Sequence, residues 1–211
     1  PRCALAGVGD SEDPYACAHL PFALPSGDYR LDPRSPRVVD PAMLLLGWGL
    51  GAYRFERYRA VQRAPARLVL EDTAAELSES FAVLKASTLV RDLVNTPTEH
   101  MGPDELEAVS REIATAHGAD ITVIAGDDLL TQNYPAIHAV GRASHRAPRL
   151  FELQWGDAAH PHIAIVGKGV CFDSGGLDIK SVAGMRNMKK DMGGSAHAIA
   201  LAELIMARKL P

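Results

Sequence analysis

The stretch that decides the fold of this 211-residue chain is GKGVCFDSGG, Gly167–Gly176, which directly follows the apolar run HIAIV, His162–Val166. A short apolar run that ends in glycines is typical of a buried strand that opens into a loop. We therefore expect a strand over His162–Val166 and a functional loop after it. This glycine-rich loop contains one lysine, Lys168, and one aspartate, Asp173, which define its chemistry.

Two phosphate-binding patterns do not fit the glycine-rich loop. A P-loop needs Ser or Thr after its Gly-Lys pair, but Gly169 follows Lys168, and the first glycine of the pattern would fall on His162. The dinucleotide pattern G-x-G-x-x-G, started at Gly167, needs a glycine where Phe172 stands. We therefore do not expect a phosphate loop.

Two lysines and two aspartates follow one another within a short segment: Lys168, Asp173, Lys180 and Asp191. Carboxylates beside glycines suit a divalent cation, because glycine leaves room for close approach. Lysine and aspartate side chains in loops are also common as simple ion pairs. Spacing alone therefore leaves two interpretations open, a metal site and a salt-bridged surface loop.

Helical and strand-like patterns alternate along the chain. Apolar residues at helical spacing predict four helices: 47–60, 74–95, 102–118 and 193–208. Further strand-like runs are Ala4–Val8, Arg67–Leu70, Ile121–Ala125 and Leu150–Trp155. The alternation predicts an α/β fold, a mixed sheet flanked by helices that is preceded by a partial smaller α/β domain. We place the partial domain at 1–72, a linking helix and linker at 73–98, and the larger domain at 99–211.

The composition is that of an ordinary globular protein, with 47% hydrophobic and 23% charged residues. The net charge of −4 and the pI near 6.1 give no general attraction for nucleic acid or for an anionic membrane. The longest apolar run, Met43–Trp48, is far shorter than the ~20 residues that cross a bilayer. We expect a soluble protein without a membrane contact.

The ends and the cysteines indicate the context of the chain. It opens with Pro1 and without a signal segment, so we interpret it as a fragment of a longer protein. Its three cysteines, Cys3, Cys17 and Cys171, form no C-x-x-C pair and are odd in number, which favours a reducing compartment, the cytoplasm. Cys171 lies in the glycine-rich loop, where we expect a buried and unreactive thiol.

Four segments stand out in order along the chain: RDLVNTPT (91–98), IHAVGRAS (137–144), VGKGVCFDSGGLDIK (166–180) and MKKDMGGSA (188–196). Together they closely resemble the leucyl aminopeptidase family of two-metal exopeptidases. The resemblance covers Leu68–Pro211 well and the earlier residues loosely. It implies that residues 99–211 form the first part of a metallo-aminopeptidase catalytic domain.

The resemblance also implies a role for each charged residue of the segment. Lys168 and Asp191 would ligate the tighter of two divalent ions (zinc, manganese or magnesium), and Asp173 would bridge both ions. Lys180 would be the catalytic lysine that polarises the scissile carbonyl. The resemblance further implies peptide substrates with a leucine-like first residue, a bicarbonate general base in the complete enzyme, and a homohexamer.

One part of the family pattern is absent from the sequence, the stretch Asn-Thr-Asp-Ala-Glu-Gly-Arg that supplies further carboxylates and an arginine. After Asp191 the only acid is Glu203. The resemblance therefore makes the parent protein a metallo-aminopeptidase, a hydrolase, while we expect the 211-residue chain alone to be inactive. The alternative is a non-catalytic binding or assembly module that keeps the first half of the fold.

A basic segment, Arg54–Arg67, mixes arginines with aromatic residues. Such a mixture can bind nucleic acid, but in a chain with an acidic balance we expect a solvated helix face instead. The histidines His160, His162 and His197 lie in no metal-ligand pattern, so we assign them no role.

Overall fold

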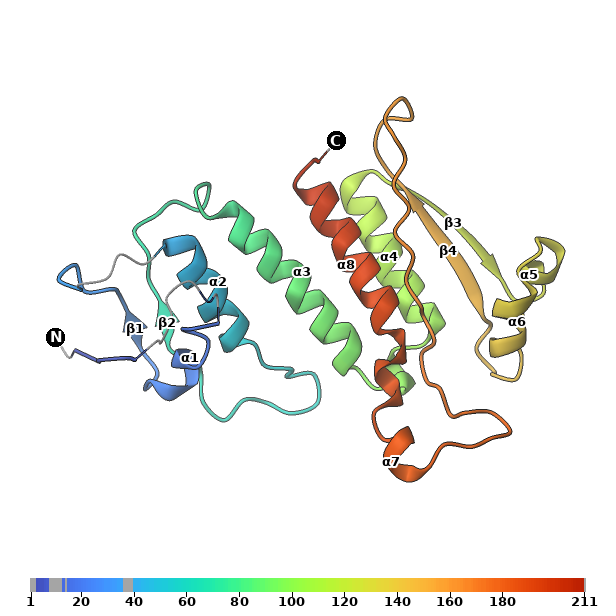
Figure 1. Cartoon of the computed structure of the whole chain (residues 1–211), viewed down its shortest axis with the longest axis horizontal. Helices are drawn as coiled ribbons and strands as arrows, with labels where there is room; N and C mark the ends of the chain where they lie inside the picture. The colour runs from blue at the N-terminus through green and yellow to red at the C-terminus, as the bar shows by residue number, and fades with distance from the viewer. Residues whose placement is uncertain (1–2, 8–12, 14, 36–39, 211) are drawn as a thin grey trace. The chain divides into compact units, whose positions relative to one another are not determined.

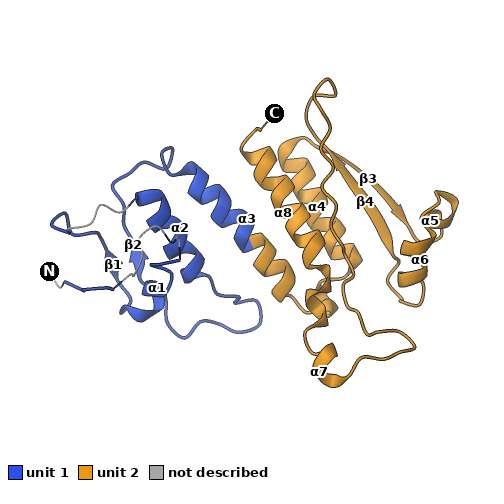
Figure 2. Ribbon diagram, viewed as in Figure 1, with its two compact units in different colours: residues 1–88 blue, residues 89–211 orange. Residues whose placement is uncertain are grey.

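The computed structural model describes residues 3–7, 13, 15–35 and 40–210. The chain forms two compact units, residues 1–88 and 89–211 (Figure 2). The boundary between the units falls inside helix α3, Ser78–Asn95. This helix confirms the long helix predicted over 74–95. Both units combine helices with a small sheet, so the predicted α/β class is confirmed (Figure 1).

The first unit is built around Trp48. Its elements are α1 (Leu20–Ala23), β1 (Asp28–Tyr29), α2 (Pro41–Ala52) and β2 (Arg67–Leu68). The two short strands pair in parallel, with Asp28 opposite Arg67. Trp48 packs against Leu20, Leu44 and Ala66, and its indole Nε1 donates a hydrogen bond to the Ala66 carbonyl at 2.9 Å. The bond satisfies the polar edge of a large buried ring.

Helix α2 begins and ends earlier than the predicted helix over 47–60. The side chain of Asp40 accepts a hydrogen bond from the Ala42 amide, and Pro41 stands in the first turn, which together fix the helix start. The helix ends at Ala52, since the Tyr53 backbone is extended (φ −56°, ψ 133°). The predicted bounds rest on apolar spacing alone, and this cap lies outside that pattern.

The prediction of a helix face for the Arg-rich segment is therefore wrong. Arg54 lies with its guanidinium 3.5 Å from the centroid of the Phe22 ring, a cation–π contact. Arg63 donates a hydrogen bond to the Leu24 carbonyl at 3.0 Å. The arginines of the segment are exposed to solvent, as expected, but the segment is not helical, and Arg54 and Arg63 hold it against residues 22–24.

Two strand predictions also change in the first unit. The prediction Arg67–Leu70 holds for Arg67–Leu68, which pair with β1. Residues 4–7 form no strand, and Val8 lies outside the described residues.

The second unit contains the longer elements. They are η1 (Thr98–His100), α4 (Pro103–His117), β3 (Asp120–Ala125), α5 (Asp128–Thr131), α6 (Pro135–Gly141), β4 (Arg149–Gln154), α7 (Val182–Met185), η2 (Met188–Met192) and α8 (Gly193–Ala207). Strands β3 and β4 pair in antiparallel register from Asp120 opposite Gln154 to Ala125 opposite Arg149. Both strands, and helices α4 and α8, lie where the sequence predicts them.

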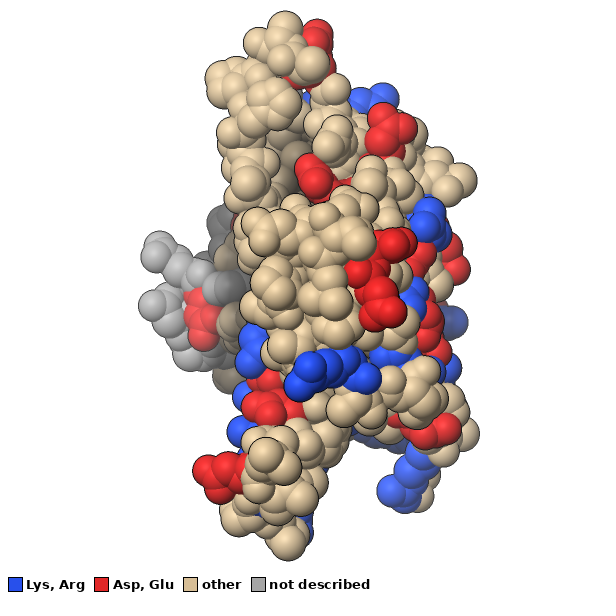
Figure 3. All heavy atoms as spheres, turned by 90° about the vertical axis from the view of Figure 1, so that its right-hand side faces the viewer, with Lys and Arg blue, Asp and Glu red and all other residues tan. Residues whose placement is uncertain are grey.

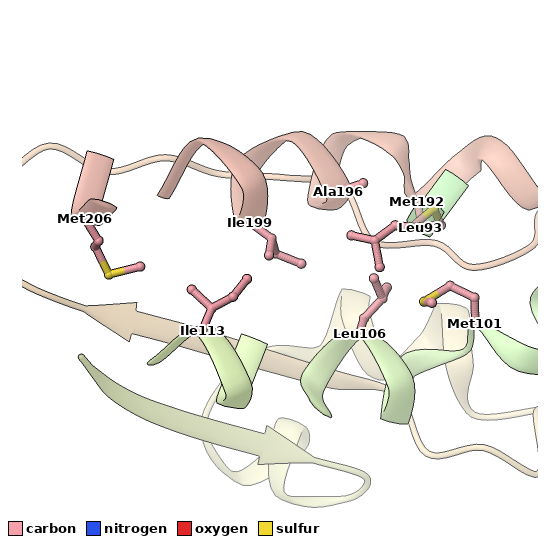
Figure 4. Packing of buried hydrophobic residues seen from close by; sticks show 8 residues of the cluster. All are labelled: Leu93, Met101, Leu106, Ile113, Met192, Ala196, Ile199 and Met206. Carbon is pink, nitrogen blue, oxygen red and sulfur yellow. The ribbon is translucent and has the colours of Figure 1, made fainter. Parts of the chain in front are cut away.

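The core of this unit lies between α4 and α8 (Figure 4). Leu106 and Ile113 of α4 face Ile199 and its neighbours on α8, and Met192 at the start of α8 is fully buried. The remaining members of the cluster are Leu93, Met101, Ala196 and Met206. This packing fixes the N-terminal end of α8, next to which Lys168 and Asp191 lie.

Both ends of helix α4 carry the signals from which it was predicted. The Glu105 side chain accepts a hydrogen bond from the Gly102 amide at 2.7 Å, and Pro103 occupies the first position. At the other end Gly118 has a left-handed backbone, with φ of +66°, as glycine readily adopts. Both signals are local, so the sequence alone reveals them.

The predicted strand His162–Val166 is wrong. The segment has no strand partner among the described residues. Its apolar side chains are open to solvent, and the exposed fraction is 86% for Ile163 and 91% for Val166. An apolar run becomes a strand only where another strand completes its backbone hydrogen bonds, and the run itself does not reveal that neighbour.

Acidic and basic side chains are mixed on the face drawn in Figure 3. In the second unit, charged side chains form a network at the start of α4. Arg146 donates to the Thr98 carbonyl at 3.1 Å and to Glu105 Oε1 at 2.8 Å, and Arg149 forms ion pairs with Asp104 and Glu107.

Among the described residues, no helix combines the length and apolar character that a membrane span needs.

Candidate metal centre

The backbone at Lys168 is pressed against the N-terminal end of α8. The Ser195 amide donates a hydrogen bond to the Lys168 carbonyl at 2.8 Å. A Cβ atom at Gly167 would lie 2.5 Å from the Gly194 carbonyl oxygen, and one at Gly194 would lie 2.8 Å from the Lys168 nitrogen. Glycine is therefore required on both sides of the contact.

A tight turn brings Asp173 and Lys180 together. The Gly175 amide donates to Asp173 Oδ1 at 2.9 Å, and the Lys180 amide donates to the Ser174 carbonyl at 2.9 Å. Gly175 has a φ of +92°, and a Cβ atom there would lie 2.3 Å from the Asp178 carbonyl oxygen, so the turn needs glycine. Across the turn, Lys180 Nζ lies 3.1 Å from Asp173 Oδ2.

Asp191 enters the site from the short helix η2. Its Oδ2 atom is buried and lies 2.9 Å from Lys168 Nζ, but the ammonium is not aligned to donate a hydrogen bond to it. A buried carboxylate oxygen without a hydrogen bond is costly, and here the charge of Lys168 offsets part of that cost, as a bound cation also would.

The four predicted residues thus form two ion pairs, Lys168 with Asp191 and Lys180 with Asp173. The Gly175 amide, the Lys180 ammonium and, more weakly, the charge of Lys168 hold the pKa of the Asp173 carboxyl below its ordinary value. The attraction by Lys168 links the two pairs electrostatically. The Asp173 carboxylate is therefore ionised at neutral pH, and each aspartate lies beside a lysine.

This donor set fits a divalent ion in part. Within the described ranges no three His, Cys, Asp or Glu side chains gather at one point. Two carboxyl groups, one with a buried oxygen that accepts no hydrogen bond, offer hard oxygen ligands of the kind that divalent cations prefer. Lys168 could join them only as the neutral amine, because an ammonium has no lone pair.

The cysteine and the histidines considered in the sequence take no part in the two ion pairs. Burial raises the pKa of the Cys171 thiol to about 11, which supports the interpretation of an unreactive cysteine. His160 and His162 are exposed, and the ring of His197 lies with Nδ1 2.7 Å from the Gly193 carbonyl. Sequence reasoning missed one residue near the site, Lys189, whose contact to Asn95 spans 94 positions and leaves no local signal.

Family models match most of the chain. Residues 88–211 match the model of the "Cytosol aminopeptidase family, catalytic domain", and residues 2–71 match that of the "M17 aminopeptidase, N-terminal domain". The probable cytosol aminopeptidase of Rhodococcus opacus is 35% identical over 190 residues, which cover 82% of this chain and 38% of that protein. The probable cytosol aminopeptidase of Corynebacterium efficiens is 38% identical over 164 residues, which cover 73% and 33%.

Solved structures agree with the sequence matches. The crystal structure of the cytosol aminopeptidase from Coxiella burnetii matches with a TM-score of 0.90 and 45% identity, covering 97% of this chain and 44% of that one. The bottromycin maturation enzyme BotP in complex with Mn matches with a TM-score of 0.76 and 32% identity, covering 94% and 44%. The chain spans less than half the length of these relatives. The predicted resemblance is confirmed, and the chain belongs to the cytosol aminopeptidase family.

Proposed function

We propose that the protein carrying this sequence is a metal-dependent aminopeptidase that releases N-terminal, leucine-like residues from peptides. One observation supports it most directly: the four motif residues form two adjacent Lys–Asp pairs around a buried carboxylate oxygen that accepts no hydrogen bond. Membership of the family adds the reaction class. A relative solved in complex with Mn favours manganese as one of the ions.

Lys168, Asp173 and Asp191 would hold the ions in this proposal. When bound, two divalent ions would supply a Lewis acid for the scissile carbonyl and an activated water. Asp191 offers its buried oxygen, and Asp173, whose low pKa keeps it ionised, offers a carboxylate between the two lysines. Lys168 would have to release its proton before its nitrogen could take part.

Lys180 would act on the substrate. Its ammonium already lies beside Asp173, the proposed bridging carboxylate, so a carbonyl oxygen bound there would be within its reach. A fixed cation at this place stabilises negative charge that develops on the carbonyl oxygen during attack. Lys180 is thus proposed as a donor to the substrate and not as a ligand.

Location, assembly and the general base rest on the family alone. We carry over a cytoplasmic location, a homohexamer and a bicarbonate general base as parts of the proposal. The mass of the whole protein in solution, measured by light scattering, tests the hexamer.

The test of the function is Asp173→Asn in the whole protein, with Asp178→Asn as matched control. Asp178 is an exposed aspartate of the same segment. Replacing a bridging carboxylate by a neutral amide should weaken manganese binding by more than about 100-fold and abolish hydrolysis of leucine p-nitroanilide. The control should bind and hydrolyse normally. A non-catalytic module would show no hydrolysis before mutation, and normal turnover of Asp173→Asn would exclude the bridging role.

A further inference from the structure

Lys189 makes a contact that the proposed chemistry does not use. Its Nζ donates a hydrogen bond to the Asn95 carbonyl at 2.5 Å, and both residues are partly buried. Asn95 is the last residue of α3, so its carbonyl is one of the groups that a helix leaves without an intrahelical partner. A cation at this end also opposes the partial negative charge of the helix. The contact thus attaches η2 to the end of α3.

Helix η2 has little stability of its own. It is a five-residue 3₁₀ helix, Met188–Met192, and no side chain caps its first residue. Short 3₁₀ segments have poor hydrogen-bond geometry and depend on tertiary contacts. Two such contacts are the fully buried Met192 at its end and the hydrogen bond of Lys189 near its beginning. Asp191 lies between these two anchors.

The position of Asp191 matters more than that of an ordinary surface acid. Its Oδ2 is buried 2.9 Å from Lys168 Nζ and accepts no hydrogen bond, so the ion pair with Lys168 is the side-chain contact that holds this oxygen. The backbone of η2 must therefore place the carboxylate within reach of Lys168. Lys190, the other lysine of this helix, is exposed and offers no comparable attachment.

We propose that Lys189 is a positioning residue for Asp191: by bonding the Asn95 carbonyl it holds η2 so that the Asp191 carboxylate faces the metal site. This inference rests on the proposed function, since it takes Asp191 as a metal ligand. Lys189 itself touches neither metal nor substrate. The removal of a residue that orients a metal ligand typically weakens metal binding about 10–100-fold.

The experiment compares four variants of the whole protein by calorimetric titration with Mn²⁺. Lys189→Met keeps the aliphatic stem but loses the ammonium, Lys189→Arg keeps a charged donor, and Lys190→Met is the matched control. Asp191→Asn removes the ligand itself. Lys189→Met should weaken the tighter Mn²⁺ site about 10–100-fold, while Lys189→Arg should recover most of the affinity and Lys190→Met should bind normally.

A second measurement needs no metal. Hydrogen exchange of the amides of residues 188–193 in the metal-free protein should accelerate in Lys189→Met and not in Lys190→Met, because the helix loses one of its two anchors. If Lys189→Met does not fold, Lys189→Gln replaces it, since the Gln amide ends one bond short of the Nζ position and cannot make the contact.

The outcomes separate this inference from the function on which it rests. Normal Mn²⁺ affinity in Lys189→Met, with strong loss in Asp191→Asn, would overturn the positioning role alone. Normal affinity in Asp191→Asn would overturn the proposed ligand set and the positioning role with it. Equal losses in Lys189→Met and Lys189→Arg would also overturn the inference, because a retained charged donor should rescue binding.

Discussion

Two neighbouring glycines at the start of α8 allow a sharp test of how Lys168 is held. A methyl group at Gly194 would lie 2.8 Å from the Lys168 nitrogen and 3.3 Å from its carbonyl oxygen, whereas one at Gly193 would meet nothing within 4 Å. Ordinary contact begins at 3.4 Å, so Gly194→Ala must push the Lys168 backbone away by about 0.6 Å. Gly193→Ala requires no movement.

The energies follow from this difference. Both substitutions gain the helix preference of alanine over glycine, about 0.5–1 kcal/mol, so this gain cancels in the comparison. Overpacking adds about 1–3 kcal/mol to Gly194→Ala alone. For a chain of this size each kcal/mol lowers the unfolding temperature by about 2–4 °C. Gly194→Ala should therefore unfold about 2–12 °C below Gly193→Ala.

Differential scanning calorimetry of the purified chain measures the difference in unfolding temperature, and Mn²⁺ titration of the whole protein measures the effect on metal binding. Displacement of Lys168 should weaken metal binding in Gly194→Ala but not in Gly193→Ala. The reasoning would be refuted by equal unfolding temperatures of the two variants, or by a lower one for Gly193→Ala. Either result would mean that the glycine-rich loop is not pressed against α8 as the geometry requires.

Four further predictions concern single features of the chain. Lys180→Ala in the whole protein should lose about 10²–10³-fold in turnover with full metal content, and loss of the tighter ion would make Lys180 a ligand instead. The 211-residue chain alone should bind Mn²⁺ weakly, at no more than one site, and should not hydrolyse leucine p-nitroanilide, because it has at most three ligand groups for one metal ion. Calorimetry that found two tightly bound Mn²⁺ ions per chain would contradict this. The pKa of Cys171 is raised to about 11, so iodoacetamide at pH 8 should modify it about 100-fold more slowly than an ordinary exposed thiol. The rate of modification should rise about tenfold per pH unit up to pH 10. If mass spectrometry found Cys171 modified as fast as free glutathione, the thiol would not be buried. Leu106→Ala, at a residue that is 2% exposed, should cost about 2–5 kcal/mol in urea unfolding, and a cost below about 1 kcal/mol would contradict the packing of α4 on α8.

The sequence predicts those elements whose ends carry local signals. Helix α4 starts at Gly102-Pro103 and stops at Gly118, and each signal acts through neighbouring residues only. Helix α2 carries such a signal as well, Asp40-Pro41, and its prediction failed because apolar spacing was preferred to the cap. The division of the chain at residues 72 and 98 stays a prediction.

The failures have a common physical cause. Strand formation at His162–Val166 depends on a neighbouring strand, and the fate of the Arg-rich segment depends on carbonyls near Phe22, so neither can be read from the segment itself. The four site residues were predicted from motifs, but the pairing of Lys168 with Asp191 spans 23 positions and needs the folded chain. The contact of Lys189 with Asn95 is longer still and was invisible in the sequence.

The burial of Trp48 has an optical consequence. The chain has two tryptophans: Trp48 is 7% exposed in the first unit, and Trp155, just after β4, is 39% exposed in the second. Each unit therefore carries its own fluorophore, and the buried indole of Trp48 should emit at a shorter wavelength than the more solvent-exposed Trp155. In Trp155→Phe the emission reports the first unit alone, and in Trp48→Phe the second. Comparing the two denaturation curves would reveal whether the units lose their structure in one cooperative step or in succession.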